Sequence, residues 1–318
     1  MNAIDVSGLT KEYGEVLAND DVSFSVGVGE VFGYLGPNGA GKTTTIRTLL
    51  GFQTPTAGTA SLLGADVHDE RALVEAKRRI GYLPANPAFD EESTGRAVLD
   101  LHAAVKGDTR RDELLELFEV PLDRKVRSYS TGQKQKLGLV QAFMHDPELV
   151  IMDEPTSGLD PLMQQRFNEF VRDEKERGTT IFLSSHVLTE VRSVCDRIAI
   201  IRDGRLVTVE RVEDLLGRSG KSVLVRTEGT VEQSEVTLAG VHDLSIRQVS
   251  GVGTEAVVGD GSGGERARET GGTELSFTFT GDVNELVDFI DRYDLLELDV
   301  EEAPLEDVFM RFYGDDDV

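Results

Sequence analysis

The first two hundred residues alternate between strand-like and helix-like patterns of apolar positions. Residues 22–26 alternate Val or Phe with Ser, which is the two-residue period of a half-buried strand. Longer apolar runs without alternation are typical of strands buried on both faces of a parallel sheet. These runs cover residues 31–35, 149–153 and 180–185.

Between the apolar runs at 31–35 and 149–153, the period changes to that of helices. From Thr94 to Pro147, apolar residues recur at helical spacing between charged ones, which predicts a mostly helical subdomain inserted into the sheet. Strands and helices then alternate up to 197–202. There an Asp203-Gly204 pair predicts a tight hairpin turn into the next strand.

A second change of pattern follows residue 217 and predicts two domains, 1–217 and 218–318. The first is an α/β domain. The second is expected to be a small α+β domain, with a glycine-rich surface loop at 259–272. Its expected strands are Ser222 to Arg226, Glu235 to Leu238 and Glu274 to Thr280, and its expected helix is Val283 to Tyr293.

A glycine-rich segment directly after the first apolar run fits the phosphate-binding pattern G-x-x-x-x-G-K-[ST]. Its backbone N–H groups can point at phosphate oxygens, Lys42 can reach the β- and γ-phosphates, and the Thr43 hydroxyl can ligate Mg²⁺. A purely structural glycine turn before a helix is the alternative. The other residues of this predicted ATP site are Gly36, Asn38, Gly39, Ala40, Gly41 and Thr44.

Two carboxylates end the apolar run at 149–152. Asp153 is expected to bind Mg²⁺, and Glu154 is expected to be the general base that polarises the attacking water. Both would face the crevice at the carboxyl ends of the strands, where α/β sheets bind ligands. The alternative is a strand that stops at a solvated acidic turn.

Three further segments make the pattern specific. Tyr129 to Gln133 reads Y-S-T-G-Q, Ser157 to Asp160 follows the two carboxylates, and His186 follows the run at 180–185. Together with the phosphate loop, they occur in the order found in ABC-type ATPases, and residues 3–215 resemble that family. The resemblance implies a P-loop ABC ATPase cassette with a mixed sheet core.

The resemblance also assigns roles to single residues. Ser130, Gly132 and Gln133 would belong to a signature loop that contacts the γ-phosphate bound to the opposite subunit, and Asp160 would lie in the loop that crosses the dimer interface. His186 would hydrogen-bond the γ-phosphate and the attacking water. Tyr13 resembles the aromatic residue on which adenine stacks, although a core or surface tyrosine fits the local sequence as well. Taken alone, Ser130 would be an ordinary helix cap.

One position departs from the family pattern. After the segment resembling Ile80 to Pro84, the family has a Gln that ligates Mg²⁺ and senses the membrane partner, whereas this chain has Ala85 and Asn86. Ala85 cannot be a ligand. Asn86 could substitute only if the backbone shifts by one residue.

Charge limits the partners of the chain. The formal net charge is −25, with 58 acidic and 33 basic residues, which argues against nucleic acid as a partner. Acid spread along the whole chain is typical of proteins adapted to high salt, where screening removes self-repulsion. An acidic protein of an ordinary cytoplasm is the alternative.

The single cysteine, Cys195, excludes an intramolecular disulfide and favours a reducing cytoplasm. No apolar run approaches the ~20 residues needed to span a bilayer, and Met1 to Asp5 lacks the features of a signal peptide. We therefore expect a cytoplasmic protein that is peripheral on the inner face of the membrane through a partner.

The sequence thus predicts an ATPase subunit of an ABC transporter, acting on a separately encoded permease as a head-to-tail C₂ dimer of two copies. The segment Leu305 to Tyr313 resembles the terminal helix of two-component exporter ATPases and favours export. Two alternatives remain, a soluble ABC ATPase of translation or DNA repair and a non-catalytic ATP-binding regulator. The resemblance implies that substrate selectivity belongs largely to the membrane subunit.

Overall fold

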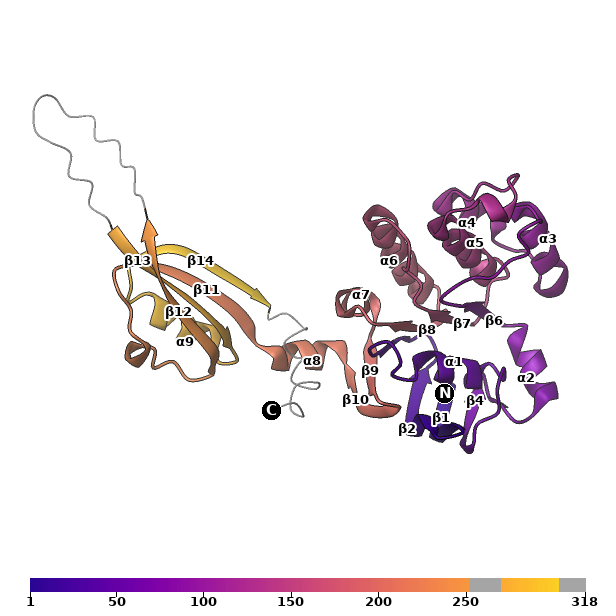
Figure 1. Ribbon diagram of the computed structural model, residues 1–318, viewed down its shortest axis with the longest axis horizontal. Helices are drawn as coiled ribbons and strands as arrows, with labels where there is room; N and C mark the ends of the chain where they lie inside the picture. The colour runs from indigo at the N-terminus through magenta and orange to yellow at the C-terminus, as the bar shows by residue number, and fades with distance from the viewer. Residues whose placement is uncertain (252–269, 303–318) are drawn as a thin grey trace, which may run out of the picture. The chain divides into compact units, whose positions relative to one another are not determined.

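The computed structural model describes residues 1–251 and 270–302, and the chain forms two compact units (Figure 1). The first unit runs from Met1 to Val212 and the second begins at Glu213. The boundary expected at residue 217 falls inside helix α8 (Val212–Ser219). This helix continues directly from the last strand of the first unit, so residue 217 lies in a helix and not in a loop.

A six-stranded sheet with the order β10-β9-β3-β8-β7-β6 forms the centre of the first unit. Its strands run parallel except β10, which pairs antiparallel with β9. Strands β3, β7 and β8 are buried along their whole lengths, as their apolar runs predicted. The strands are β3 (Val31–Leu35), β6 (Ile80–Leu83), β7 (Leu149–Asp153), β8 (Thr180–Ser185), β9 (Arg197–Arg202) and β10 (Arg205–Arg211).

A second, antiparallel sheet has the order β2-β1-β4-β5. The alternation at 22–26 is confirmed, since Val22, Phe24 and Val26 of β2 are buried. Phe24 stacks on Phe32 and Phe182 of the large sheet, with ring centroids 5.5 and 5.9 Å away. The strands are β1 (Asn2–Tyr13), β2 (Val16–Gly27), β4 (Ala57–Leu62) and β5 (Ala65–Asp66).

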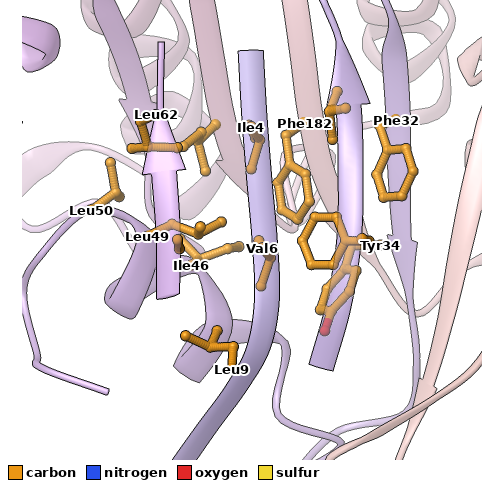
Figure 2. Close-up of a cluster of buried hydrophobic side chains, with 14 of the residues drawn as sticks. Ile4, Val6, Leu9, Phe32, Tyr34, Ile46, Leu49, Leu50, Leu62 and Phe182 are labelled. Carbon is orange, nitrogen blue, oxygen red and sulfur yellow. The ribbon is translucent and has the colours of Figure 1, made fainter. Parts of the chain in front are cut away.

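Side chains from both sheets and from the helix after the phosphate loop share one hydrophobic core (Figure 2). Ile46 and Leu49 of that helix are fully buried in it. The core therefore fixes the direction of the helix whose N-terminus closes the phosphate loop. Outside residues 94–147, the helices of the first unit are α1 (Lys42–Leu49), α2 (Glu70–Lys77), α6 (Pro161–Glu176) and α7 (Leu188–Val194).

Residues 94–147 carry the expected helices, between β6 and β7. They form α3 (Gly95–Lys106), α4 (Arg111–Phe118), a short 3₁₀ turn at Val126–Ser128 and α5 (Thr131–Phe143). Thr94 caps α3 by accepting the N–H of Ala97 at 3.2 Å. We refer to α3, α4 and α5 together as the helical insertion.

The predicted hairpin is also confirmed. Strands β9 and β10 pair through a turn in which Asp203 has φ 48° and Gly204 has φ 79°. Two successive positive φ angles match the right-handed twist of the flanking strands. In this turn the Gly204 N–H donates to the Ala40 carbonyl at 3.1 Å, and this hydrogen bond holds the phosphate loop against the hairpin.

The second unit is a four-stranded sheet with one helix, consistent with the α+β class expected for it. Its strand order is β12-β13-β11-β14, and Leu286, Phe289 and Ile290 of the helix pack on its core. The elements are β11 (Lys221–Glu228), a 3₁₀ turn at Gln233–Glu235, β12 (Val241–Gly251), β13 (Thr270–Phe279), α9 (Val283–Ile290) and β14 (Leu295–Glu302).

Three details of the second unit differ from the sequence predictions. Glu235 to Leu238 is not a strand, because a reciprocal cap between Glu232 and Glu235 begins a 3₁₀ turn there, and Leu238 packs on the core from a loop. Strands β12 and β14 were not predicted. The end of the expected glycine-rich loop, from Thr270, is the start of β13.

Two predictions fall outside the described residues, namely the rest of the glycine-rich segment and the terminal segment Leu305 to Tyr313. Among residues 1–251 and 270–302, no helix is long and apolar enough to cross a membrane. Cys195 is buried against Gly33 and carries a free thiol. Burial raises the pKa of this thiol well above its ordinary value, as expected for a packed cysteine.

Candidate functional site

The phosphate loop connects the end of β3 with the first residue of α1. Two of its glycines are required by close contacts, because a Cβ at Gly36 would lie 2.5 Å from the Ile201 carbonyl and one at Gly41 would lie 2.4 Å from the Ala18 carbonyl. Gly41 also has φ 104°, a conformation that other residues rarely adopt. The loop thus takes a course that only this glycine pattern allows.

Lys42 begins α1 with its ammonium group almost fully buried under the loop. Its Nζ donates to the Gly36 carbonyl at 2.6 Å and to the Pro37 carbonyl at 3.3 Å, and it lies 3.2 Å from Glu154 Oε1. A buried cation with carbonyl partners is available to an anion that enters the loop.

Asp153, the last residue of β7, is held by two hydroxyl groups. The Thr43 hydroxyl donates to Asp153 Oδ2 at 2.8 Å, and the Ser184 hydroxyl donates to Oδ1. Asp153 is 2% exposed, so both carboxylate oxygens have fixed directions. The Thr43 hydroxyl and the Asp153 carboxylate are hard oxygen donors in contact with each other beside the phosphate loop, and this donor set fits Mg²⁺.

Glu154 follows in a left-handed backbone conformation with φ 50°, which is uncommon for a residue other than glycine. Its N–H donates to the Ser184 carbonyl at 3.1 Å. The carboxylate lies between Lys42 Nζ, 3.2 Å from Oε1, and His186 Nδ1, 2.8 Å from Oε2. The positive φ turns the Glu154 side chain out of the strand and over the phosphate loop.

His186 lies beyond the end of β8 with about half of its side chain exposed. The Glu154 carboxylate accepts, so this hydrogen bond requires a proton on His186 Nδ1 and leaves Nε2 on the opposite side of the ring. The opposite ring nitrogen is therefore free to face a ligand or a water.

A cavity of about 260 Å³ lies over this cluster. The phosphate loop, Asp153, Glu154 and Ala85 line it, whereas Asn86 is exposed and is not part of the lining. Beside it, burial and the nearby Asp153 carboxylate raise the pKa of the Tyr82 hydroxyl, so that phenol stays neutral. The structure therefore puts the position of the missing Gln in the cavity wall, as Ala85.

A larger cavity of about 480 Å³ opens at the other ends of β7 and β8, around Asp146, Arg177 and Thr180. Its walls carry neither the phosphate loop nor the two strand-end carboxylates. Because ligands of such sheets bind at the carboxyl ends of the strands, we place the functional site at the smaller cavity.

The signature-loop residues and Asp160 are not brought to this cavity within the chain. Ser130 caps α5 in a reciprocal cap, in which its hydroxyl accepts the Gln133 N–H at 3.2 Å and its own N–H donates to Gln133 Oε1 at 3.1 Å. Gly132 lies against Gly158, since a Cβ there would be 2.6 Å from the Gly158 carbonyl. Asp160 caps α6 by accepting the N–H of Met163 at 3.0 Å.

Tyr13 lies at the end of β1 with 47% of its surface exposed. Its hydroxyl donates to Gln53 Oε1, and the Gln53 amide donates to the Thr44 carbonyl at 2.9 Å. The tyrosine is thus tied to the first turn of α1 through one side chain. An exposed flat ring at this place is open to stacking by a base.

Sequence reasoning missed four residues that hold this site together. Asn19 donates to the Gly41 carbonyl and to the Thr45 hydroxyl, at 3.4 and 3.0 Å. Gln135, in α5, donates to the Glu154 and Pro155 carbonyls, at 3.3 and 2.9 Å. Ser184 holds Asp153, and Glu190 accepts from Thr156 and Ser185. Of these four residues, only Ser184 could have been noticed from the sequence, because Ser184 and Ser185 directly precede His186.

Comparison with known sequences agrees with this geometry. A sequence profile described as "ABC transporter" matches residues 19–157. The bacitracin transport ATP-binding protein BcrA of Bacillus licheniformis is 32% identical over 322 residues, covering 98% of this chain and 97% of that protein. The Nod factor export ATP-binding protein I of Mesorhizobium japonicum is 34% identical over 320 residues, covering 98% and 87%.

An uncharacterized ABC transporter ATP-binding protein of Nostoc sp. is 41% identical over 213 residues. That match covers 64% of this chain, which spans 62% of the length of that relative. Among solved structures, one described as the ATP-binding subunit of an ABC transporter has a TM-score of 0.61 and 33% identity, over 67% of this chain and 91% of the other. The predicted fold class is confirmed by this match.

Proposed function

This chain belongs to the ATP-binding subunits of ABC transporters, a family of ATPases, and we propose that it hydrolyses MgATP as the motor of an exporter, in a head-to-tail dimer on a separate membrane permease. The observation that carries the proposal is the Glu154 carboxylate held between Lys42 and His186, beside the Thr43–Asp153 pair.

In this proposal the phosphate loop binds the triphosphate through backbone N–H groups at the start of α1. Lys42 exchanges its carbonyl contacts for the β- and γ-phosphate oxygens. Thr43 and Asp153 hold Mg²⁺, which neutralises charge on the phosphates when it is bound. Tyr13, exposed and tied to α1 through Gln53, offers its ring to the adenine.

Glu154 is proposed as the general base. Its Oε2 accepts from His186 Nδ1–H, so the imidazole helps to aim the carboxylate over the phosphate loop. The base takes one proton from the attacking water, and the oxygen of that water forms the new bond to the γ-phosphorus as the bond to ADP breaks. His186 Nε2, on the opposite side of the ring from this contact, is proposed to hold the attacking water.

A second copy is proposed to complete the site. Ser130, Gly132, Gln133 and Asp160 lie outside the cavity walls of their own chain, and Ser130 is exposed at the N-terminus of α5. A helix N-terminus with a hydroxyl is a donor set for an anion. In a C₂ dimer, each of the two signature loops would then face the phosphate loop of the other copy.

Four exposed apolar side chains fit a membrane partner. Leu101 and Val105 lie one turn apart on α3 and are 70% and 66% exposed, and Phe52 and Val74 are 59% and 56% exposed. Phe52 packs on Tyr82 of β6 and under Lys77 of α2. We call Phe52, Val74, Leu101 and Val105 the docking patch. The export direction is supported by the name of the Nod factor relative.

The docking patch also bears on location. A subunit held by a permease through this patch would be peripheral on the cytoplasmic face of the membrane, where ATP is available. The second unit is proposed as an accessory domain, since none of its described residues, 213–251 and 270–302, lines the nucleotide cavity.

The catalytic part is tested by Glu154→Gln. ATP turnover by the purified protein should fall roughly 10²- to 10⁴-fold, while ATP binding persists and an ATP-bound dimer accumulates in gel filtration. Glu148→Gln is the matched control, because it makes the same change at the opposite end of β7, where Glu148 pairs with Arg79. Near-normal turnover in Glu154→Gln would remove the residue from the mechanism.

The same experiment decides a second candidate, a non-catalytic ATP-binding regulator, which the Ala85 position favours. A regulator would bind ATP with no Mg²⁺-dependent turnover in the wild-type protein. The geometry around Glu154 favours the catalyst.

The transport part is tested by reconstitution with the membrane protein that copurifies with the chain. That partner should stimulate turnover, and Leu101→Ser with Val105→Ser should abolish the stimulation while the isolated subunit keeps its basal rate. Val28→Ser is the control, because Val28 is 61% exposed in the turn between β2 and β3, outside the docking patch. Recovery of the native protein with ribosomes or DNA ends, and never with a membrane protein, would favour a soluble ABC ATPase instead.

A further inference from the structure

The turn between β7 and α6 carries Glu154 at its start and the crossing loop, Ser157 to Asp160, at its end. Between them lies Thr156, which is 5% exposed. Its hydroxyl donates to Glu190 Oε1 at 2.6 Å, and Glu190 lies 34 residues later, on α7. A short hydrogen bond to a carboxylate is among the strong ones, so Thr156 has a firm partner outside its own turn.

The second oxygen of the same carboxylate holds a different segment. The hydroxyl of Ser185, a fully buried residue, donates to Glu190 Oε2 at 2.9 Å. Ser185 Oγ in turn accepts the Val187 N–H at 2.9 Å, which fixes the turn that presents His186. Glu190 therefore bridges the turn after the general base and the turn that carries the histidine.

These contacts close a ring. His186 reaches Glu154 at 2.8 Å, Glu154 continues along the chain to Thr156, Thr156 binds Glu190, and Glu190 returns through Ser185 to His186. A displacement of the crossing loop cannot reach Thr156 without moving Glu190, and a displacement of Glu190 moves the turn that aims the imidazole at the base. The Thr156 and Ser185 hydroxyls do not need a charged acceptor to complete their hydrogen bonding. The Glu190 carboxylate, however, has two oxygens and can therefore hold both segments at once.

We propose that Glu190 is a positioning residue that couples the crossing loop to the His186–Glu154 pair, so that arrival of the second copy at the crossing loop sets the general base. The inference rests on the proposed dimeric ATPase, in which the crossing loop lies at the interface between copies. Glu190 does not line the nucleotide cavity, and acts through Thr156 and Ser185.

The test compares Glu190→Ala with the wild type in ATP turnover at increasing ATP concentration. We expect kcat to fall about 10- to 100-fold, the scale of a small misplacement of catalytic groups. The Hill coefficient should fall toward one, and the Kd for ATP should stay within about twofold, because the phosphate loop is unchanged. Thr189→Ala is the matched control, as Thr189 is an exposed neighbour on α7.

If Glu190→Ala folds poorly, Glu190→Gln and Thr156→Val test the same link with smaller changes. Glu190→Gln should restore part of the rate, since a carboxamide oxygen still accepts one hydroxyl. Thr156→Val should lower the Hill coefficient in the wild type and change little in Glu190→Ala, because both changes break the same link. A residue that serves only stability would lower the melting temperature without separating kcat and cooperativity from ATP affinity.

Two negative results have different meanings. If turnover and cooperativity in Glu190→Ala and Glu190→Gln stay within about twofold of the wild type, the role of Glu190 is overturned. The ATPase proposal would still stand. A wild-type protein with no turnover and no ATP-dependent dimer would overturn both.

Discussion

Arg110 and Glu174 form a two-point ion pair that joins the helical insertion to the sheet core. Arg110 Nη1 and Nη2 lie 2.8 and 2.6 Å from the two oxygens of Glu174, and the side chains are 4% and 1% exposed. Arg110 is the residue before α4, and Glu174 is near the end of α6. The pair fixes the start of α4 relative to α6, the helix that follows the crossing loop.

Glu174→Gln should therefore be strongly destabilising. Removing the buried member of such a pair costs up to about 3–5 kcal/mol, and the more exposed partners Glu113 and Asp146 offset only part of this loss. Urea unfolding should show this loss, whereas Glu113→Gln, which removes a 56% exposed partner of the same arginine, should cost less than about 1 kcal/mol. Equal losses for both variants would contradict the anchoring role of Glu174.

The buried pair of His102 and His145 should make the folded protein less stable in acid. Their rings face each other at 5.4 Å between α3 and the end of α5, and burial together with the Lys106 ammonium lowers the pKa of each from 6.5 to about 4. Below pH 6.5 the unfolded chain binds protons that the folded chain does not. Stability is then full above pH 6.5 and falls as the pH drops from 6.5 toward 4.

His145→Phe should remove part of this acid loss. Between pH 7 and pH 5, we expect the free energy of unfolding of the variant to fall by about 1–2 kcal/mol less than that of the wild type. His242→Gln, an exposed histidine of the second unit, should leave the pH dependence unchanged. The reverse ranking of the two variants would refute a role for the buried pair.

The acid excess predicts a requirement for salt. With a net charge of −25, self-repulsion should weaken as KCl approaches molar levels, where the Debye length falls to about 3 Å. Melting temperature and turnover should both rise with KCl. A melting temperature that is flat between ~0.1 M and ~2 M KCl would mean that the acidic surface is not an adaptation to salt.

The cavity wall at Ala85 gives a prediction on metal dependence. Ala85 lines the site and Asn86 is exposed, so Asn86→Ala should change turnover by less than about twofold, while Ala85→Gln should lower the Mg²⁺ concentration needed for half-maximal turnover. A Mg²⁺ titration of both variants measures this. A large loss in Asn86→Ala would show that Asn86 reaches the metal after a shift of the backbone.

The sequence by itself determined the parts of this protein that depend on neighbours along the chain. The phosphate loop, the buried strand that ends in Asp153 and Glu154, and the Asp203-Gly204 hairpin follow from period and spacing over a few residues. The strand pattern was wrong at Glu235 to Leu238, where a reciprocal cap between Glu232 and Glu235 begins a 3₁₀ turn and Leu238 packs on the core from a loop.

Only the tertiary structure decided how the functional residues are held. Glu190 and Thr156 are 34 residues apart, and Arg110 and Glu174 are 64 apart. No periodicity relates such positions, because which side chains meet depends on how strands and helices pack and on the direction in which each side chain leaves its element. The sequence thus placed the chemistry at the strand ends, and packing of α5, α6 and α7 determined the contacts that aim it.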